Sequence, residues 1–219
     1  MIFSSHEVKT EKFYEVGVGK FGDYHDRYLN FGYWDNGIVD YVKASENLLK
    51  RVADKIGLNY SSHLLDVACG MGTQDSFFIK TYDCIKIDGL DLTKKHIEIA
   101  KQYNCDPRIV FTQGNACKLP FLNETFTHVI GIEGPANFNT REDFFKEAFR
   151  TLKPGGKLGL SDYLLPRKPK NWYEKLLIKN IVRLWHMPIQ NVQTKEEFKE
   201  TLEKIGFINV EVEVVTYSV

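Results

Sequence analysis

The chain has 219 residues, which is enough for one well-buried α/β domain with a small lid and too few for two full domains. Its 29 basic and 29 acidic side chains balance, so no overall field draws it to nucleic acid or an anionic membrane, although this leaves room for a local basic patch. The four cysteines form no CxxC pair and no zinc-like spacing with histidine, which predicts reduced thiols and no metal site. Without a signal-peptide pattern or an apolar run near ~18–20 residues, we expect a soluble, cytoplasmic protein with no membrane span.

Residues 1–62 precede the first predicted strand, and their apolar period is helical. An apolar stripe from Ile38 to Ile56 ends at Gly57, as a helix C-terminus does. Before it lies an aromatic cluster interrupted by glycines, which is made of Tyr24, Tyr28, Phe31, Tyr33 and Trp34. This cluster is compatible with a cap over the core and with a lid over a ligand.

Residues 63–73 predict a strand followed directly by a sharp turn. The apolar run from Leu64 to Ala68 has the length and branching of a buried parallel strand. Gly70 and Gly72 then permit backbone angles closed to other residues and let a ligand approach the main chain. A helix predicted over 74–82 points its N-terminal amides at this turn. The strand, the glycine loop and the helix together indicate a nucleotide-type pocket.

Three kinds of ligand use such a turn. A P-loop needs Gly-Lys-Ser/Thr at its end, and no lysine is present here. A dinucleotide site favours glycine or alanine three residues after the second glycine, where this chain has Asp75, a negative charge near the expected pyrophosphate. S-adenosylmethionine carries no phosphate, and Asp66 at the strand end suits a cationic ligand. Asp91, 19 residues after Gly72, ends the next predicted strand and either binds both ribose hydroxyls or caps the helix near Thr93.

Helices and strands alternate after the turn. We expect helices over 93–103 and 141–152 and strands over 85–92, 109–112, 127–132 and 157–164. This alternation predicts a Rossmann-like, doubly wound, mostly parallel sheet with helices on both faces. Five polar side chains are expected at the carboxyl ends of its strands, namely Asp66, Asp91, Asn115, Glu133 and Asp162.

The last quarter of the chain predicts a basic loop, two helices and a strand. Apolar residues recur at helical spacing from Trp172 to Trp185, and Pro188 stops the pattern. A second helix over 194–205 has a capping box and ends at Gly206. Alternation over 210–217 predicts a half-exposed strand. Either this strand is the sixth of the sheet, or a partner chain covers its edge in a homodimer, or the C-terminus was trimmed.

Four stretches in order resemble the class I S-adenosylmethionine-dependent methyltransferases of the small-molecule type. They are Leu64–Thr73, Gly89–Leu92, Gln113–Ala116 with Leu119–Phe121, and Leu152–Leu158. The resemblance implies a single domain over 1–219. Its expected parts are an N-terminal helical cap or lid (1–62), a cofactor-binding core (63–165), a helical acceptor-pocket insertion after the fifth strand (166–193) and a last helix and strand (194–219).

The resemblance also implies functional residues. The cofactor S-adenosyl-L-methionine, whose product is S-adenosyl-L-homocysteine, is expected to contact Asp66, Ala68, Gly70, Gly72, Asp91, Leu92, Asn115, Ala116, Glu133, Tyr33 and Trp34. The acceptor is expected to contact Tyr28, Asn137, Trp185 and His186. Asn137 stands where several relatives have a histidine base, so the candidate bases are His186 and Glu133. Each also has a structural alternative, because His186 suits a helix end and Glu133 suits binding of backbone amides in a loop or the lid.

The expected reaction is in-line transfer of a methyl group to a small-molecule acceptor, which could be a natural product, an isoprenoid or lipid-like molecule, or an amine. A hydroxyl or carbon acceptor needs a base, whereas a neutral amine needs none. Two other functions stay open: a non-catalytic S-adenosylmethionine-binding module and an NAD(P)-dependent oxidoreductase.

Overall fold

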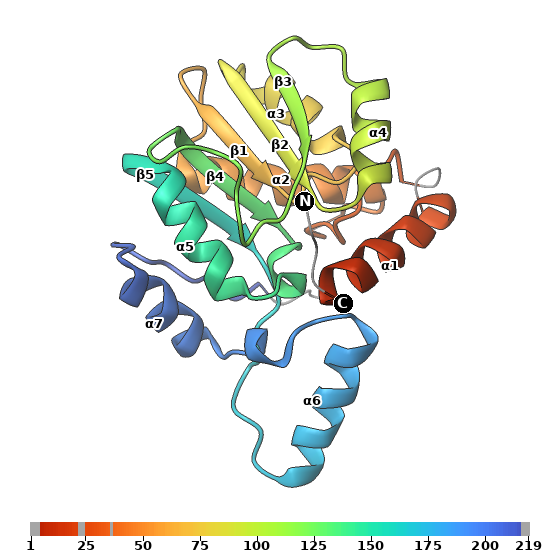
Figure 1. The fold of residues 1–219 in the computed structure, drawn as a ribbon, viewed down its shortest axis with the longest axis vertical. Coiled ribbons are helices and arrows are strands. Elements are labelled where there is room, and N and C mark those ends of the chain that lie inside the picture. Colours follow the sequence, from red (N-terminus) through yellow and green to blue (C-terminus); the bar gives the residue numbers. More distant parts are fainter. Residues whose placement is uncertain (1–4, 22–24, 36, 216–219) are drawn as a thin grey trace.

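The protein is built around a five-stranded parallel sheet. The structure, a computed structural model, describes residues 5–21, 25–35 and 37–215. The strand order is β3-β2-β1-β4-β5, and every pairing is parallel (Figure 1). The strands are β1 His63–Val67, β2 Lys86–Asp91, β3 Ile109–Gln113, β4 Phe126–Ile132 and β5 Leu152–Ser161. The predicted doubly wound architecture is confirmed.

The core forms two layers, one on each face of the sheet. Successive residues of β1 point to opposite faces, so Leu64 packs in one cluster and Leu65 in the other. Helices α2 (Tyr41–Ile56) and α3 (Thr73–Tyr82) cover the first face, whereas α5 (Arg141–Thr151) and α7 (Lys195–Ile205) cover the second. Helix α4 (Lys94–Tyr103) packs on β2 and β3.

Local end signals set the helix boundaries. Gly57 ends α2 in the left-handed conformation, with φ of 69°. Thr194 and Glu197 form the predicted capping box at the start of α7. A buried ion pair between Arg141 and Asp162, 2.7 Å apart, joins the start of α5 to the residue after β5. Asp162 therefore stabilises the junction where the chain leaves the sheet, in place of the expected role at the ligand edge.

The strand predicted over 210–217 is absent from its described part, residues 210–215. Val210 and Val212 pack against the core, and Glu213 forms ion pairs with Arg51 and Lys55 of α2. These side-chain contacts hold the segment without a backbone ladder. The expected sixth strand is therefore wrong for the described residues, and so is the strand edge on which the expected homodimer depended. Tyr217, also part of that prediction, lies outside the described residues.

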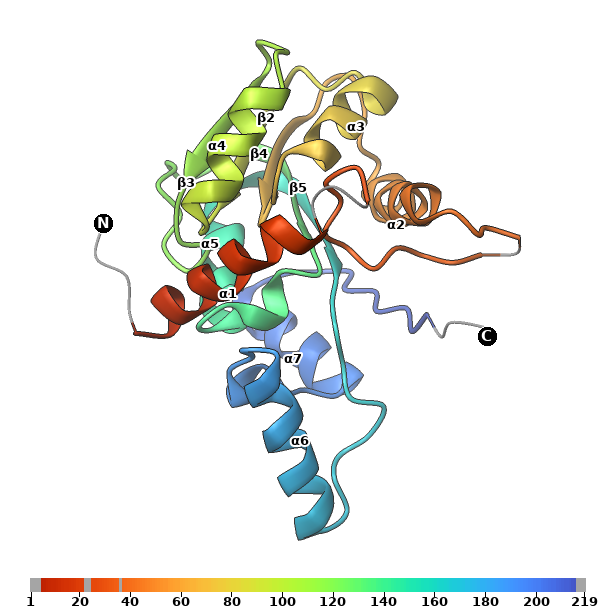
Figure 2. The same cartoon turned by 90° about the vertical axis from the view of Figure 1, so that its right-hand side faces the viewer.

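Two helices lie outside the layered core. Helix α1 (Ser5–Phe21) crosses the carboxyl edge of the sheet, and α6 (Trp172–Leu184) projects away from the body of the domain (Figures 1 and 2). The structure also has two short 3-10 turns, η1 (Pro135–Asn137) and η2 (Ile189–Asn191). Among the helices that the structure describes, none combines the length and apolar character needed to cross a membrane.

Candidate active site

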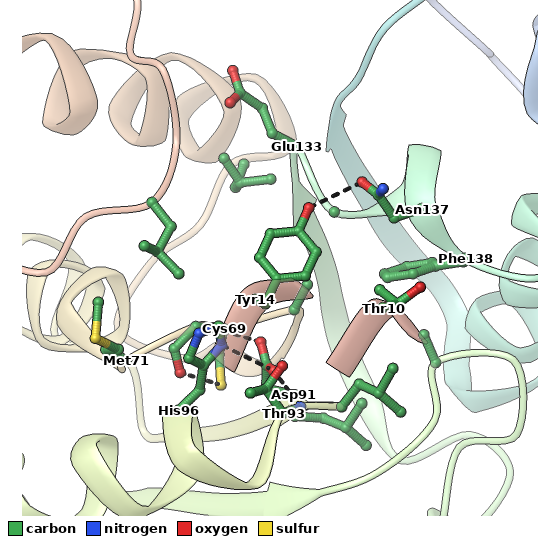
Figure 3. A pocket seen from close by; sticks show the side chains of 18 of the residues that line it. Thr10, Tyr14, Cys69, Met71, Asp91, Thr93, His96, Glu133, Asn137 and Phe138 are labelled. Atoms are coloured by element: carbon green, nitrogen blue, oxygen red, sulfur yellow. Dashed lines mark hydrogen bonds and ion pairs between the residues drawn. The ribbon is translucent and has the colours of Figure 1, made fainter. Parts of the chain in front are cut away.

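A pocket lies at the carboxyl ends of β1, β2 and β4 (Figure 3). Helix α1 crosses this edge of the sheet (Figure 2). Nine of the predicted site residues line the pocket: Tyr28, Ala68, Gly70, Asp91, Leu92, Asn115, Ala116, Glu133 and Asn137. The pocket thus lies beyond the strand ends, which is where parallel sheets bind their ligands.

Gly70 and Gly72 have different roles in the turn. Gly70 lines the pocket with φ of +56°, and a Cβ added there would lie 3.1 Å from Leu29 Cδ1. A Cβ on Gly72 would instead collide with Ala100 and Phe111, between α4 and β3. Gly72 thus permits the turn and close packing. It is not part of the described pocket lining, so its expected contact with the cofactor stays a prediction.

Asp91 is the centre of a buried hydrogen-bond network at one end of the pocket. Its carboxylate accepts from the backbone amides of Gly70 at 3.0 Å and Thr93 at 2.8 Å. The imidazole Nδ1 of His96 lies 3.2 Å away. Burial raises the pKa of Asp91, but His96 and the two amides outweigh it, so the net pKa lies below the ordinary value. The capping contact with Thr93 is present, and an ionised carboxylate faces the pocket.

Asp66 reaches the pocket only through a neighbour. Both of its oxygens accept from Gln74 Nε2, at 2.9 and 2.7 Å, and Gln74 is the residue that lines the pocket. Asp75 is fully buried near it, behind the turn. Burial raises the pKa of Asp66 to about 7, and burial together with the Asp66 charge raises the pKa of Asp75 well above its ordinary value. Direct contact of Asp66 with a cationic ligand is therefore not supported, and Asp75 does not face the pocket as a charge.

We expect Asp75→Asn to flatten the pH dependence of stability. A carboxyl whose native pKa exceeds its unfolded pKa binds more protons in the native state, so stability falls as pH rises from about 4 to the native pKa. The free energy of unfolding of the native protein should fall by about 2 kcal/mol between about pH 5 and pH 8 because of Asp66 and Asp75. That of the variant should fall less. Urea unfolding at both pH values measures this. The exposed Asp83→Asn, at the end of the same helix, is the control, and equal slopes in all three proteins would contradict the assignment.

Hydrogen bonds hold Asn115 between the backbone at Cys117 and helix α1. Its Oδ1 accepts from the amide of Cys117 at 2.8 Å, and its Nδ2 donates to Glu7 at 2.6 Å. The acceptor oxygen of Asn115, a residue expected to contact the cofactor, thus already takes one hydrogen bond. Glu7 also lines this part of the pocket and adds a second carboxylate.

Helix α1 supplies pocket residues that the sequence analysis did not identify. Four residues of this helix line the pocket, namely His6, Glu7, Thr10 and Tyr14. Tyr14 lies centrally, between the Asp91 network and Asn137, and donates to Asn137 Oδ1 at 3.2 Å (Figure 3). Burial, with the charges of Asp91 and Glu133, raises the pKa of Tyr14 to about 12, so this hydroxyl is a donor at neutral pH. The spacing of Glu7, Thr10 and Tyr14 on one helical face was the available signal.

Glu133 and Asn137 mark the other end of the pocket. Glu133 accepts from the Phe31 amide at 2.8 Å, which is the lid contact anticipated as its structural alternative. Burial raises the pKa of Glu133 to about 7, with a smaller contribution from the charge of Asp162. The carboxyl thus lies near the midpoint of its titration at neutral pH, which suits proton transfer.

Two aromatic residues that were expected to contact the cofactor pack outside the described pocket lining. The Tyr33 ring stacks under the guanidinium of Arg51 on α2, 4.7 Å from its centroid. Trp34 donates to the carbonyl of Phe31 and packs edge-on against Tyr41. Both rings therefore pack on the α2 side, outside the described pocket lining, so their expected contact with the cofactor gains no support and stays a prediction. Tyr24 of the same cluster lies outside the described residues, and Tyr28 lines the pocket.

Trp185 lies one contact away from the pocket, and His186 contacts a residue outside the described pocket lining. The carbonyl of Trp185 accepts from Asn137 Nδ2 at 2.6 Å, and its ring lies edge-on to Phe31. His186 packs against Phe13 of α1, with ring centroids 4.8 Å apart. We call these four side chains, Phe13, Phe31, Trp185 and His186, the aromatic rim. The rim is partly exposed, and neither Trp185 nor His186 belongs to the described pocket lining.

Three lining residues carry buried nitrogens without a hydrogen-bond partner in the described structure. They are Arg27 Nε, Asn30 Nδ2 and His96 Nε2. Buried polar atoms are rarely left unpaired, so each indicates a ligand group. His96 Nε2 is an acceptor in the neutral ring whose Nδ1 donates to Asp91, and a donor in the charged ring, whereas Arg27 and Asn30 offer donors. This donor and acceptor set fits a polar ligand with both hydroxyl and carboxylate groups.

A parallel sheet of this order, with a glycine turn after its first strand and an acid ending the second, defines a Rossmann-like domain for a nucleoside-containing cofactor. The family described as a methyltransferase domain matches residues 64–156. The erythromycin 3''-O-methyltransferase of Saccharopolyspora erythraea is 36% identical over 194 residues, which are 84% of this chain and 63% of that protein. Residues 64–156 therefore form a methyltransferase domain, and this match and the relative support a class I S-adenosylmethionine-dependent methyltransferase. The chain spans less than two thirds of that relative's length.

Solved structures agree on the fold. The [4+2]-cyclase SpnF has a TM-score of 0.74 at 20% identity, over 93% of this chain and 73% of that one. The geranyl diphosphate C-methyltransferase from Streptomyces coelicolor A3(2), in complex with Mg²⁺, geranyl diphosphate and S-adenosyl-L-homocysteine, has a TM-score of 0.73 at 15% identity, over 92% and 79%. These identities support the architecture alone, because one fold hosts different chemistries.

Proposed function

We propose that the protein transfers a methyl group from S-adenosylmethionine to a hydroxyl of a small-molecule acceptor. The observation that carries this is one pocket that joins the glycine turn and Asp91 to a carboxyl with a pKa of about 7, Glu133. The 36% identity to an O-methyltransferase supports a hydroxyl over an amine or a carbon acceptor. The acceptor class is a natural product or a similar small molecule.

The residues present fit the cofactor. Gly70 leaves room for close approach of a ligand to the backbone, and Asp91 with His96 offers acceptors for ribose hydroxyls. Arg27 and Asn30 carry unpaired donors that suit the cofactor's carboxylate. When bound, S-adenosylmethionine supplies an already activated methyl group, so positioning and exclusion of water are the main tasks of the protein.

Side chains at the Glu133 end then have separate tasks. Asn137 cannot accept a proton at neutral pH, and it orients the acceptor while Tyr14 fixes its amide. Glu133 takes the proton that the acceptor hydroxyl loses as the new C–O bond forms. Helix α1 covers the reacting atoms and keeps water out. His186, on the aromatic rim, is the competing base, and its distance from the described pocket lining favours Glu133.

The test is calorimetry followed by a transfer assay. S-adenosylhomocysteine should bind, and NADH should not. Labelled methyl should then pass to a macrolide that carries free sugar hydroxyls, such as an erythromycin with a free 3''-hydroxyl. Binding of the cofactor product without transfer to any hydroxyl of a macrolide panel would favour a non-catalytic module. Binding of NADH alone would favour an oxidoreductase.

Asp91→Ala is expected to weaken S-adenosylhomocysteine binding by about 1–3 kcal/mol, the cost of losing a charge-assisted hydrogen bond to the ribose. Calorimetry at neutral pH measures it. Asp88→Ala is a matched control on the same strand, because Asp88 pairs with His63 at the opposite end, away from the described pocket lining. Unchanged affinity in Asp91→Ala would remove the ribose assignment.

A further inference from the structure

Helix α6 exposes an unusually apolar surface. Of its 13 residues only Val182 is buried. Trp172 and Leu184 are each 75% exposed, and Tyr173, Leu177 and Ile181 are exposed as well. Tyr173, Leu177, Ile181 and Leu184 recur every three or four residues, so they form one continuous stripe on the helix. An exposed apolar stripe of this size on a projecting helix indicates a surface that something else covers.

The same segment is strongly basic in an otherwise neutral chain. Residues 166–186, which we call the α6 appendage, carry six cationic side chains and one acidic side chain, Glu174. Arg167 pairs with Glu174, and Lys168 pairs with Glu197 of α7. Lys175, Lys179 and Arg183 follow one another at four-residue spacing, a second stripe away from the apolar one. These three cations form no ion pair within the part of the chain that the structure describes.

The apolar stripe and the cationic stripe together indicate which partner covers the helix. A second copy that packed through the apolar stripe would leave the cationic stripe outside the contact and without a partner. A lipid bilayer with anionic headgroups complements both stripes at once. Aliphatic and aromatic side chains enter the boundary between headgroups and acyl chains, and lysine and arginine extend to the phosphates. Tryptophan and tyrosine at the start of the helix favour the same interface.

We propose that the α6 appendage docks the protein on an anionic lipid surface. Leu177, Ile181 and Leu184 enter the membrane interface, and Lys175, Lys179 and Arg183 contact the headgroups. The C-terminal end of α6 is tied to the pocket by the hydrogen bond from Asn137 to Trp185. Docking therefore places the aromatic rim close to the lipid surface. The inference stands on the appendage alone and does not require the proposed methyl transfer.

The test is flotation of the full chain with vesicles of phosphatidylcholine mixed with phosphatidylglycerol, compared with phosphatidylcholine alone. We expect binding to the mixed vesicles at low salt, and weaker binding at high salt. Emission of Trp172 should shift to shorter wavelength on binding, and Trp172→Phe should remove most of that shift. The double variant Lys175→Gln/Lys179→Gln should weaken binding about 30-fold, because each surface lysine contributes about fivefold.

Matched variants separate a specific surface from general stickiness. Leu184→Glu should weaken binding at least about tenfold, whereas Leu122→Glu, an equally exposed leucine at 83%, should not. Lys101→Gln/Lys153→Gln removes two exposed lysines elsewhere and should leave binding unchanged. Absence of flotation with the mixed vesicles would overturn the proposal. So would a dimer in sedimentation velocity that Leu184→Glu dissociates in a protein that does not float, because a second copy would then cover the stripe.

Discussion

Gly70→Val is expected to lower the affinity for S-adenosylhomocysteine at least about a hundredfold while the fold is retained. Gly70 lines the pocket at the point where the turn approaches the ligand, and its amide donates to Asp91. A valine there would extend toward Leu29, and its branched Cβ would fill space that the cofactor needs. Calorimetry measures the affinity, and circular dichroism checks the fold.

Gly155→Val is the matched control for that substitution. Gly155 also has a positive φ, +77°, but an added Cβ would meet nothing within 4 Å. Both variants therefore carry the backbone strain of a branched residue in the left-handed region, about 1–2 kcal/mol. Only Gly70→Val should lose binding. Equal loss in both variants would attribute the effect to stability, and normal binding by Gly70→Val would exclude close approach of the ligand to the turn.

The parts of the fold that could be predicted are those that local sequence patterns specify. The apolar run from Leu64 to Ala68 specified the first strand, and Gly57 and the Thr194 capping box specified helix ends. Each signal acts within a few residues, so neighbouring sequence contains all of it. Alternation over 210–217 had the same local form and was misleading. Glu213 there pairs with Arg51, 162 residues earlier, and such contacts take the place of strand pairing in the described segment.

The candidate site was predictable where it lies on strand ends and unpredictable where α1 completes it. Glu7 contacts Asn115 across 108 residues, and Tyr14 contacts Asn137 across 123. A local period can predict that residues form a helix, but it does not specify which distant surface that helix covers. The role of α1 in the site therefore could not be predicted from the period of its own residues. Tyr33 illustrates the converse case. Its sequence motif resembles a lid, but its ring packs against the guanidinium of Arg51 on the nearer helix α2.

Glu133→Gln is expected to lower the methyl-transfer rate about 10²–10⁴-fold, the usual contribution of a general base. The carboxylate is the active form, and its pKa is raised to about 7. The rate of the unmodified enzyme should therefore rise with pH through about 7 and level off above it. Glutamine cannot take a proton, so the variant should lack this inflection. The rate with the macrolide acceptor is measured from about pH 5.5 to pH 9.

A structural role for Glu133 predicts something different. The Glu133 carboxylate anchors the lid through the Phe31 amide, and glutamine keeps an acceptor oxygen for that contact. Glu133→Gln should thus retain its S-adenosylhomocysteine affinity and thermal stability while turnover falls. His186→Asn, which removes the competing base on the aromatic rim, should retain the inflection. If His186→Asn loses the inflection and Glu133→Gln keeps it, proton removal belongs to the rim, and Glu133 serves only to hold the lid.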